Sequence, residues 1–166
     1  MISTFTAIDF ETAIVHHICS VGIVTFENGE IVEEYQALIQ PPNNTYGWHN
    51  IKVHGITSNE TKSSPSFNEI YPEIRKRIYG RTLVAHNESF DRRVLLTSMR
   101  DNHIAYSDLN IADKWECTFR IYKAKGYKPT NLNACCKIHG IQLEHHQALS
   151  DARACAKLFL LAQNDR

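Results

Sequence analysis

Alternating apolar and polar positions predict strands in the first quarter of the chain. Residues 4–10 are rich in Thr, Ile and Phe, which favours a strand, and a second apolar run covers 17–26. The pair Asn28-Gly29 separates this run from a third one at 31–40 and is typical of a two-residue hairpin turn. The chain therefore begins with a predicted three-stranded antiparallel meander.

After Pro41 and Pro42, a polar loop is expected to about residue 52, and the apolar positions then recur with helical spacing. The clearest apolar helix face consists of Phe67, Ile70, Tyr71, Ile74 and Ile78. Gly80 ends this helix, and the short apolar run 82–86 is a predicted strand. Further helices are predicted over 88–102, 117–124, 131–140 and 148–163.

Strands that first follow one another and then alternate with helices predict a mixed sheet covered by helices. This is an α/β fold, in which ligands bind at the strand ends beside the helices. A length of 166 residues fits one domain over 1–166. The chain has 43% apolar and 22% charged residues, which is typical of a globular protein. It shows no signal peptide pattern and no apolar run near the ~20 residues that a membrane helix needs. We therefore expect a cytoplasmic protein without a membrane partner.

Cysteine content and net charge limit which metal sites and nucleic-acid partners are expected. Five cysteines without a C-x-x-C pair indicate a reduced protein with packing cysteines, and a zinc site at Cys135, Cys136 and His139 is the alternative. A formal net charge of zero argues against a protein that holds a long nucleic acid by bulk charge. It leaves room for a small site that holds the end of a strand.

Asp9 and Glu11 stand two positions apart in an otherwise apolar strand. Side chains two apart on a strand point to the same face, so the two carboxylates are expected side by side. Burying like charges without a partner costs several kcal/mol, and a divalent cation is the best compensation because it prefers carboxylate oxygens. The alternative is a strand end at which both acids point into water.

Two more acids could join this pair. Asp91 lies near the start of the helix after strand 82–86, where its alternative role is to complement the helix dipole, worth ~0.3–1 kcal/mol. Asp151 lies near the start of the last helix, and His146 precedes it by five residues. Within one helix these two side chains would point apart. His146 is therefore expected in the preceding loop, where it could face a site that has Asp151 at its base. The alternative is an ordinary loop histidine and a first-turn acid.

Four motifs in this order resemble those of the DEDDh 3′–5′ exonucleases: Asp9-x-Glu11, His54-Gly55-Ile56, Asn87-x-x-Phe90-Asp91 and His146-x-x-x-x-Asp151. This family includes bacterial DNA polymerase III epsilon subunits, exonuclease X and ribonuclease T. The resemblance extends from residue 4 to about 162. It implies a ribonuclease-H-like fold, with a five-stranded mixed sheet whose first three strands are antiparallel, flanked by helices.

The resemblance also implies roles for individual residues. Two Mg²⁺ or Mn²⁺ ions are expected to be held by Asp9, Glu11, Asp91 and Asp151. His146 is the expected general base, and His145 is a competing base whose spacing to Asp151 is one residue too long for the family pattern. Phosphodiester hydrolysis suits such a set, because two ions ~3.5–4 Å apart can activate a water and stabilise the leaving oxygen. An imidazole with a pKa of about 6.5 can accept the proton near neutral pH.

Substrate contacts are implied at six positions: Thr12, Ala13, Ile14, His54, Ile56 and Asn87. Thr12 would meet the terminal 3′-hydroxyl, with Ala13 and Ile14 at the strand-wedge positions. The turn at His54 and Ile56 would pack on the terminal nucleotide, and Asn87 would orient the strand near the scissile phosphate. Basic residues that could contact phosphates are Arg92, Arg93, Lys123, Lys125 and Lys128, for which solvated surface charge is the alternative.

The expected function is removal of nucleotides from the 3′ end of a nucleic acid, DNA in preference to RNA, with release of nucleoside 5′-monophosphates. The alternatives are an exoribonuclease that trims RNA, a proofreading subunit beside a DNA polymerase, and an inactive nucleic-acid-binding module. The presence of all four acids and of the histidine argues against an inactive binding module. No clamp-binding or polymerase-binding tail is visible after the last predicted helix, so a stand-alone nuclease or an isolated domain is expected.

Overall fold

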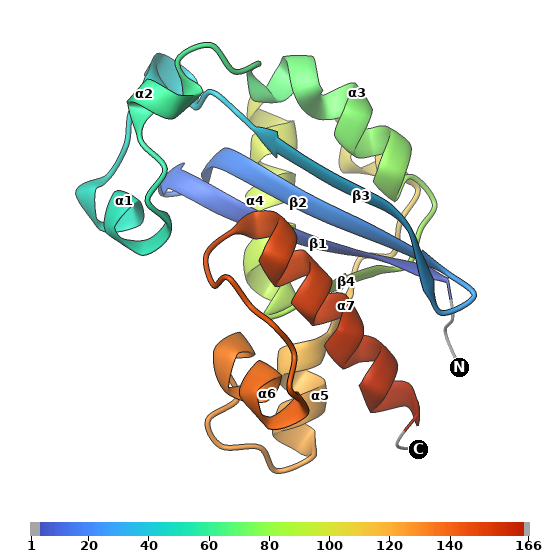
Figure 1. Ribbon diagram of the computed structural model, residues 1–166. Coiled ribbons are helices and arrows are strands. Elements are labelled where there is room, and N and C mark those ends of the chain that lie inside the picture. Colours follow the sequence, from blue (N-terminus) through green and yellow to red (C-terminus); the bar gives the residue numbers. More distant parts are fainter. Residues whose placement is uncertain (1–3, 165–166) are drawn as a thin grey trace.

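The computed structural model describes residues 4–164 and contains a five-stranded mixed sheet with helices on both faces (Figure 1). The strand order is β3-β2-β1-β4-β5. The antiparallel meander consists of β1 (Phe5–Ile14), β2 (His17–Glu27) and β3 (Glu30–Leu38). The short strands β4 (Leu83–Ala85) and β5 (Glu116–Cys117) extend the sheet in parallel with β1. The expected fold class is confirmed.

The helices follow the predicted order, with two additions. They are α1 (Trp48–His54), α2 (Ser58–Thr61), α3 (Phe67–Ile78), α4 (Glu88–Asp101), α5 (Thr118–Ala124), α6 (Leu132–His139) and α7 (Ala148–Asn164). Short 3-10 turns lie at Pro42–Asn44 and Tyr106–Leu109. Helices α1 and α2 were not predicted, and α1 begins where a polar loop was expected. None of the helices described is long and apolar enough to cross a membrane.

Alternation along β1 divides the core into two parts. Ile8 and Phe10 belong to the cluster formed with α3 and α4, behind the sheet in Figure 1. Phe5 and Ala7 belong to the cluster formed with α7, in front of the sheet. By the same alternation Asp9 points to the α7 face, where the apolar core would otherwise continue.

The shortness of β4 leaves room for a site beside β1. The parallel pairing of these strands consists of Thr6 with Leu83 and Ala7 with Val84. Strand β4 ends at Ala85, so beyond Ile8 this edge of β1 has no strand beside it in the described sheet. A site at the carboxyl end of neighbouring parallel strands is the place where α/β sheets bind ligands.

Gly22 sets how closely α7 packs on the sheet. It lies opposite Asp9 in the β1–β2 register. A Cβ atom added at Gly22 would lie 2.2 Å from the backbone carbon of Ala148 and 2.3 Å from the backbone nitrogen of Leu149. The first turn of α7 therefore rests directly on the backbone of β2, and this contact holds Asp151 near Asp9.

We expect Gly22→Ala to displace the start of α7 and to cost ~1–3 kcal/mol of the free energy of unfolding, the usual range for overpacking. Because Asp151 is in the displaced turn, nuclease activity should fall as well. The control is Gly29→Ala, since its added Cβ would meet nothing within 4 Å and only its positive φ of 85° strains the chain. Urea denaturation and activity assays measure both effects. Full activity in Gly22→Ala would show that this contact does not position Asp151.

All five cysteines are free and buried. Cys135 and Cys136 pack in the apolar cluster that joins α5, α6 and α7. His139, the third residue of the alternative zinc site, has its Nε2 atom 3.1 Å from the hydroxyl of Tyr127. No group of potential metal ligands among the described residues includes these two cysteines.

Candidate active site

A cleft of about 520 Å³ opens where β1 passes the end of β4. It is bordered by β1, α1, the starts of α4, α5 and α6, and the loop before α7. Its lining residues are Asp9, Phe10, Glu11, Thr12, His49, Asn50, Val53, His54, His86, Asn87, Phe90, Phe119, Asn131, Leu132, His145, His146 and Asp151.

The structure brings three of the four predicted acids together at the floor of this cleft. Carboxylate oxygens of Asp9, Glu11 and Asp151 lie within 4.8 Å of one another. Asp91 lies behind the wall of the cleft and is 2% exposed. It comes from α4, on the other side of the sheet, and its Oδ1 accepts a hydrogen bond of 3.0 Å from the backbone N–H of Phe10. The two layers of helices thus each contribute one acid to the pair on β1.

Burial shifts the pKa values of all four carboxyl groups upward, and repulsion by neighbouring acids adds to the shift at Asp9, Glu11 and Asp91. Burial raises the pKa of Asp9 well above its usual value, and the charges of Asp91, Asp151 and Glu11 raise it further. Burial and the charges of Asp151 and Asp91 raise the pKa of Glu11 to about 8. Burial raises the pKa of Asp91 to about 8, and that of Asp151 is also raised by burial. The protein alone disfavours four negative charges here.

The donor set fits a divalent cation. Asp151 Oδ2 accepts hydrogen bonds from the ring of His145 and the backbone of His146, whereas the buried Oδ1 atom has no partner among the described residues. A buried carboxylate oxygen without a donor is costly, and so is the repulsion among four acids. A hard divalent cation would remove both costs, because carboxylate oxygens are its preferred ligands.

We expect the metal-free protein to lose stability as the pH rises from about 4 to about 8. In this window the raised pKa values mean that the folded protein binds more protons than the unfolded chain, so the free energy of unfolding falls with pH. The pKa of Glu11, which moves from 4.5 to about 8, alone corresponds to a loss on the order of a few kcal/mol.

Urea denaturation in EDTA at the two ends of this range measures the loss. Saturating Mg²⁺ should restore stability at the higher pH, because the ion binds the deprotonated acids of the folded state. Equal stability of the metal-free protein at both pH values would contradict the shifted pKa values.

His145 and His146 both line the cleft. Neighbouring side chains in an extended loop would point to opposite sides, but these two residues form a turn in which His146 has a positive φ of 68°. Their rings stack with centroids 3.8 Å apart. The Nδ1 atom of His145 lies 3.0 Å from Asp151 Oδ2, and the backbone N–H of His146 donates to the same oxygen at 3.2 Å.

Thr12 is held by two side chains of α1. His54 accepts the backbone N–H of Ile56 at its Nδ1 atom, so its proton is on Nε2, which donates to the Thr12 carbonyl at 3.1 Å. Asn50 donates to the same carbonyl at 2.8 Å and lies 3.2 Å from the Thr12 hydroxyl. Burial lowers the pKa of His54, which favours the neutral ring that this arrangement needs.

Of the remaining predicted substrate contacts, one lines the cleft and three do not. Asn87 lines the cleft at the residue before α4, where it has a left-handed φ of 69° and its side chain makes no capping hydrogen bond to the helix. Ala13 is fully buried and does not line the cleft. Ile14 and Ile56 are partly exposed and do not line the cleft.

Several lining residues were not found from the sequence. His49, Asn50 and Val53 belong to α1, which buries none of its residues and so lacks a periodic apolar face. The signal that could have revealed α1 is Gly55, which ends it in a left-handed conformation typical of helix C-termini. Phe119 and Leu132 reach the cleft from the first turns of α5 and α6.

Two of the basic residues considered for phosphate contacts are engaged elsewhere. Arg92 donates to Glu88 at 3.0 Å, and Arg120 donates to the other oxygen of this carboxylate at 2.7 Å. Burial raises the pKa of Glu88, but these two hydrogen bonds outweigh it and lower the pKa overall. Lys125 donates to the carbonyl of Ala162 in α7. These contacts stabilise the fold around the cleft.

Comparison with known proteins identifies the family. The profile of the RNase T exonuclease family, described as "Exonuclease", matches residues 6–159. Two curated relatives are PolC-type DNA polymerase III from Thermotoga petrophila, 29% identical over 95% of this chain, and from Halalkalibacterium halodurans, 30% identical over 94%. A third is the 3′-5′ exonuclease DinG of Staphylococcus aureus, 29% identical over 96% of this chain. The chain spans only 12%, 11% and 18% of the length of these three relatives.

Solved structures share the fold. The nuclease domain of 3′hExo, a DEDDh family member bound to rAMP, superposes with a TM-score of 0.83 at 18% identity, covering 98% of this chain and 92% of that one. Exonuclease X in complex with 5′ overhanging duplex DNA superposes with a TM-score of 0.76 at 24% identity, covering 96% and 91%. With a family match over nearly the whole chain and acids gathered at one cleft, this chain belongs to the RNase T family of DEDDh 3′–5′ exonucleases, enzymes that hydrolyse phosphodiester bonds.

Proposed function

We propose that this chain removes nucleotides from the 3′ end of DNA with two Mg²⁺ or Mn²⁺ ions held by Asp9, Glu11, Asp91 and Asp151. The observation that carries the proposal is that Asp9, Glu11 and Asp151 gather at the floor of one cleft, with Asp91 buried behind its wall and with the pKa values of all four acids raised. Family membership already implies a divalent metal. Four carboxylates roughly neutralise two divalent ions, which supports the proposed number.

Individual residues of the chain have separate roles in the proposed hydrolysis. When bound, the ions would stabilise the charge that develops on the phosphate and the leaving oxygen. His146 accepts the proton of the attacking water. Burial and the charges of His145 and His54 lower its pKa, which leaves the ring neutral and able to act as a base at neutral pH. Thr12, fixed by Asn50 and His54, receives the terminal 3′-hydroxyl, and Asn87 orients the strand.

DNA is the proposed substrate because several related proteins act on DNA or are bound to it. Two are DNA polymerases, and the structure of Exonuclease X contains duplex DNA. A second candidate is RNA, since the structurally similar nuclease domain of 3′hExo is bound to rAMP. The two substrates differ by the 2′-hydroxyl, which a protein can read directly.

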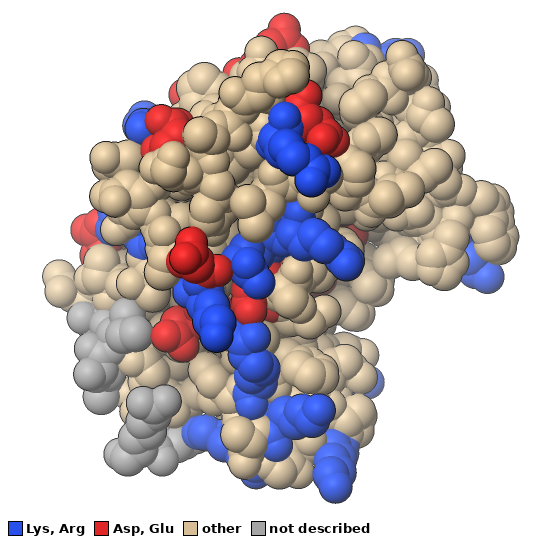
Figure 2. All heavy atoms as spheres, turned by 180° about the vertical axis from the view of Figure 1, so that it is seen from behind, with Lys and Arg blue, Asp and Glu red and all other residues tan. Residues whose placement is uncertain are grey.

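The charge of the surface supports contact with a nucleic acid beyond the cleft. The net charge is zero, but Figure 2 shows Lys and Arg gathered in a band down the centre and lower part of the rear face. Arg92, Arg93 and Arg100 line a groove beside α4. Lys123 lies 5.9 Å from the ring of Phe119, which itself lines the cleft. We propose Lys123 as the contact that links the cleft to the phosphates beyond it.

An end-labelled substrate tests the proposal. A 5′-labelled single-stranded DNA should shorten into a ladder with Mg²⁺ or Mn²⁺ and stay intact with EDTA. Duplex DNA and RNA of the same sequence, run in parallel, decide between the two candidate substrates. A circular single strand is the control for polarity, because it has no 3′ end. Cleavage of the circle, or a ladder that persists in EDTA, would contradict the proposed activity.

A further inference from the structure

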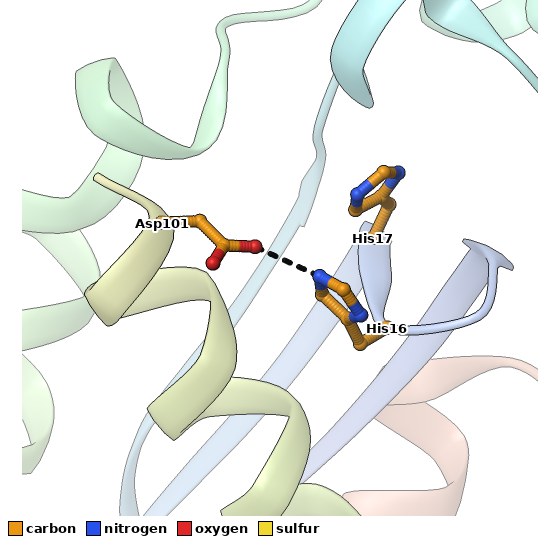
Figure 3. Close-up of side chains that lie close together, drawn as sticks. All are labelled: His16, His17 and Asp101. Carbon is orange, nitrogen blue, oxygen red and sulfur yellow. Dashed lines mark hydrogen bonds and ion pairs between the residues drawn. The ribbon is translucent and has the colours of Figure 1, made fainter.

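A second group of potential metal ligands lies apart from the cleft, at the turn between β1 and β2. It consists of His16, His17 and Asp101, whose candidate ligand atoms lie within 4.8 Å of one another (Figure 3). Asp101 is the last residue of α4, and Asp91 is near its start. Ten residues of helix correspond to about 15 Å, so this group is well separated from the four acids.

The turn brings together two side chains that a strand would separate. Neighbouring residues in an extended chain point to opposite faces. Here Val15 has a positive φ of 52°, His16 is in the turn, and His17 is the first residue of β2. As a result the two imidazole rings lie with centroids 4.6 Å apart and at 81° to each other. In Figure 3 both rings lie beside Asp101 on the same side of the turn.

The hydrogen bonds of this group are incomplete. His16 Nε2 lies 2.8 Å from Asp101 Oδ2. His17 has a buried Nδ1 atom without a hydrogen-bond partner among the described residues. Apart from His16, the described contacts place Arg100 beside the aspartate, with its Nε 3.7 Å from Oδ1 and its side chain 76% exposed. The ion pair of His16 and Asp101 therefore leaves the adjacent imidazole unsatisfied, which an ordinary structural contact does not explain.

We propose that His16, His17 and Asp101 bind one Zn²⁺ ion. Two imidazoles and a carboxylate form a donor set that zinc prefers, and the fourth position is open to water. Ligand atoms of a tetrahedral zinc site are about 3–3.5 Å apart, so small side-chain rotations suffice to close the set. His17 and Asp101 also border a pocket of about 300 Å³, which gives solvent access to the ion.

The ion would join the β1–β2 turn to the end of α4. The turn continues from β1, which carries Asp9, and α4 carries Asp91, so the zinc ion would stabilise the relative position of these two elements at a distance from the acids. The role is structural, because none of the three ligands lines the catalytic cleft. The inference does not depend on which nucleic acid the enzyme degrades.

Calorimetric titration of the full chain with ZnCl₂, in excess Mg²⁺ to occupy the acidic cleft, tests the site. We expect one equivalent of Zn²⁺ to bind and to raise the melting temperature. His17→Ala should weaken binding by at least ~10–100-fold, the weight of a lost interaction at a metal site. The matched control is His103→Asn, at an exposed histidine two residues after Asp101, which should leave zinc binding unchanged because asparagine tolerates the left-handed φ of 59° there.

Cobalt gives an independent readout, because Co²⁺ absorbs strongly in a tetrahedral site with nitrogen ligands and weakly in an octahedral site of oxygens. The wild type and Asp9→Asn should both show the strong absorption, and His16→Ala and His17→Ala should lose it. Absence of zinc binding in the presence of Mg²⁺, or binding that survives in His17→Ala, would overturn the proposal. In that case His16 and Asp101 form a simple ion pair that joins the turn to α4.

Discussion

Asp9→Asn is expected to lower the rate of 3′-end hydrolysis by ~10³-fold or more, since metal ions contribute several kcal/mol to such reactions. The substitution removes one negative charge from a group whose oxygens lie within 4.8 Å of one another. The neighbouring acids cannot replace the lost ligand, because each already has a place in the set. Single-turnover rates on a 5′-labelled oligonucleotide at saturating Mg²⁺ measure the effect.

The same substitution is expected to raise the melting temperature of the metal-free protein at pH 8. Most substitutions of buried residues destabilise, so the opposite sign is diagnostic. Burial and three neighbouring acids raise the pKa of Asp9, which means that its charged form is unfavourable in the folded state. An amide of the same size carries no charge and removes this repulsion. With Mg²⁺ present the order should reverse, because only the wild type gains the full binding energy.

Glu30→Gln is the control for both effects. It removes one negative charge from an exposed position at the start of β3, far along the chain from the cleft residues. Neither the rate nor the dependence of stability on metal should change. Normal turnover in Asp9→Asn would exclude this residue as a metal ligand, and a collapse of the melting temperature would show that the acid holds the fold.

His146→Asn is expected to lower the single-turnover rate by ~10²–10⁴-fold at saturating metal, the usual weight of a general base. Asparagine is the suitable replacement because it tolerates the left-handed φ that His146 adopts, whereas alanine would add backbone strain. Metal binding should survive, since all four carboxylates remain. The backbone N–H that donates to Asp151 also remains.

His145→Asn is the matched comparison, and it should act through metal affinity. The ring of His145 contacts Asp151 Oδ2, so its loss changes a proposed metal ligand without removing the proposed base. Its rate should approach that of the wild type once the metal concentration is raised. A large defect at saturating metal in His145→Asn, with a nearly normal His146→Asn, would transfer the role of base to His145.

The elements that bury a long apolar face were predictable. The five-residue face of α3 lies over 67–78 as its spacing indicated, and α4 and α7 begin at residues 88 and 148, as expected. The missed elements lack such a face. Helix α1 buries none of its residues, and β5 has only two residues, which the neighbouring strand rather than local sequence places in the sheet.

The residues of the candidate site also fall into those that a local sequence pattern predicts and those that only the tertiary structure places. The pair Asp9 and Glu11 was predictable because two charges interrupt an apolar strand, and this pattern is visible in a single sequence. His49 and Asn50 were not, because they reach the cleft on a helix whose position depends on contacts with Thr12 rather than on its own periodicity. The geometry of His145 and His146 depends on one left-handed residue, which alternation along an extended chain cannot predict.

The contact between Gly22 and the first turn of α7 also has a consequence for biosynthesis. Domains fold as the chain leaves the ribosome, beginning with the N-terminal part. Strands β1 and β2 can pair early, but Gly22 has no cover until Ala148 and the rest of α7 have emerged. Asp151 then reaches Asp9 as part of the last described helix to dock. A nascent chain therefore carries an incomplete set of acids, and the proposed nuclease acquires its activity only when its translation has passed α7.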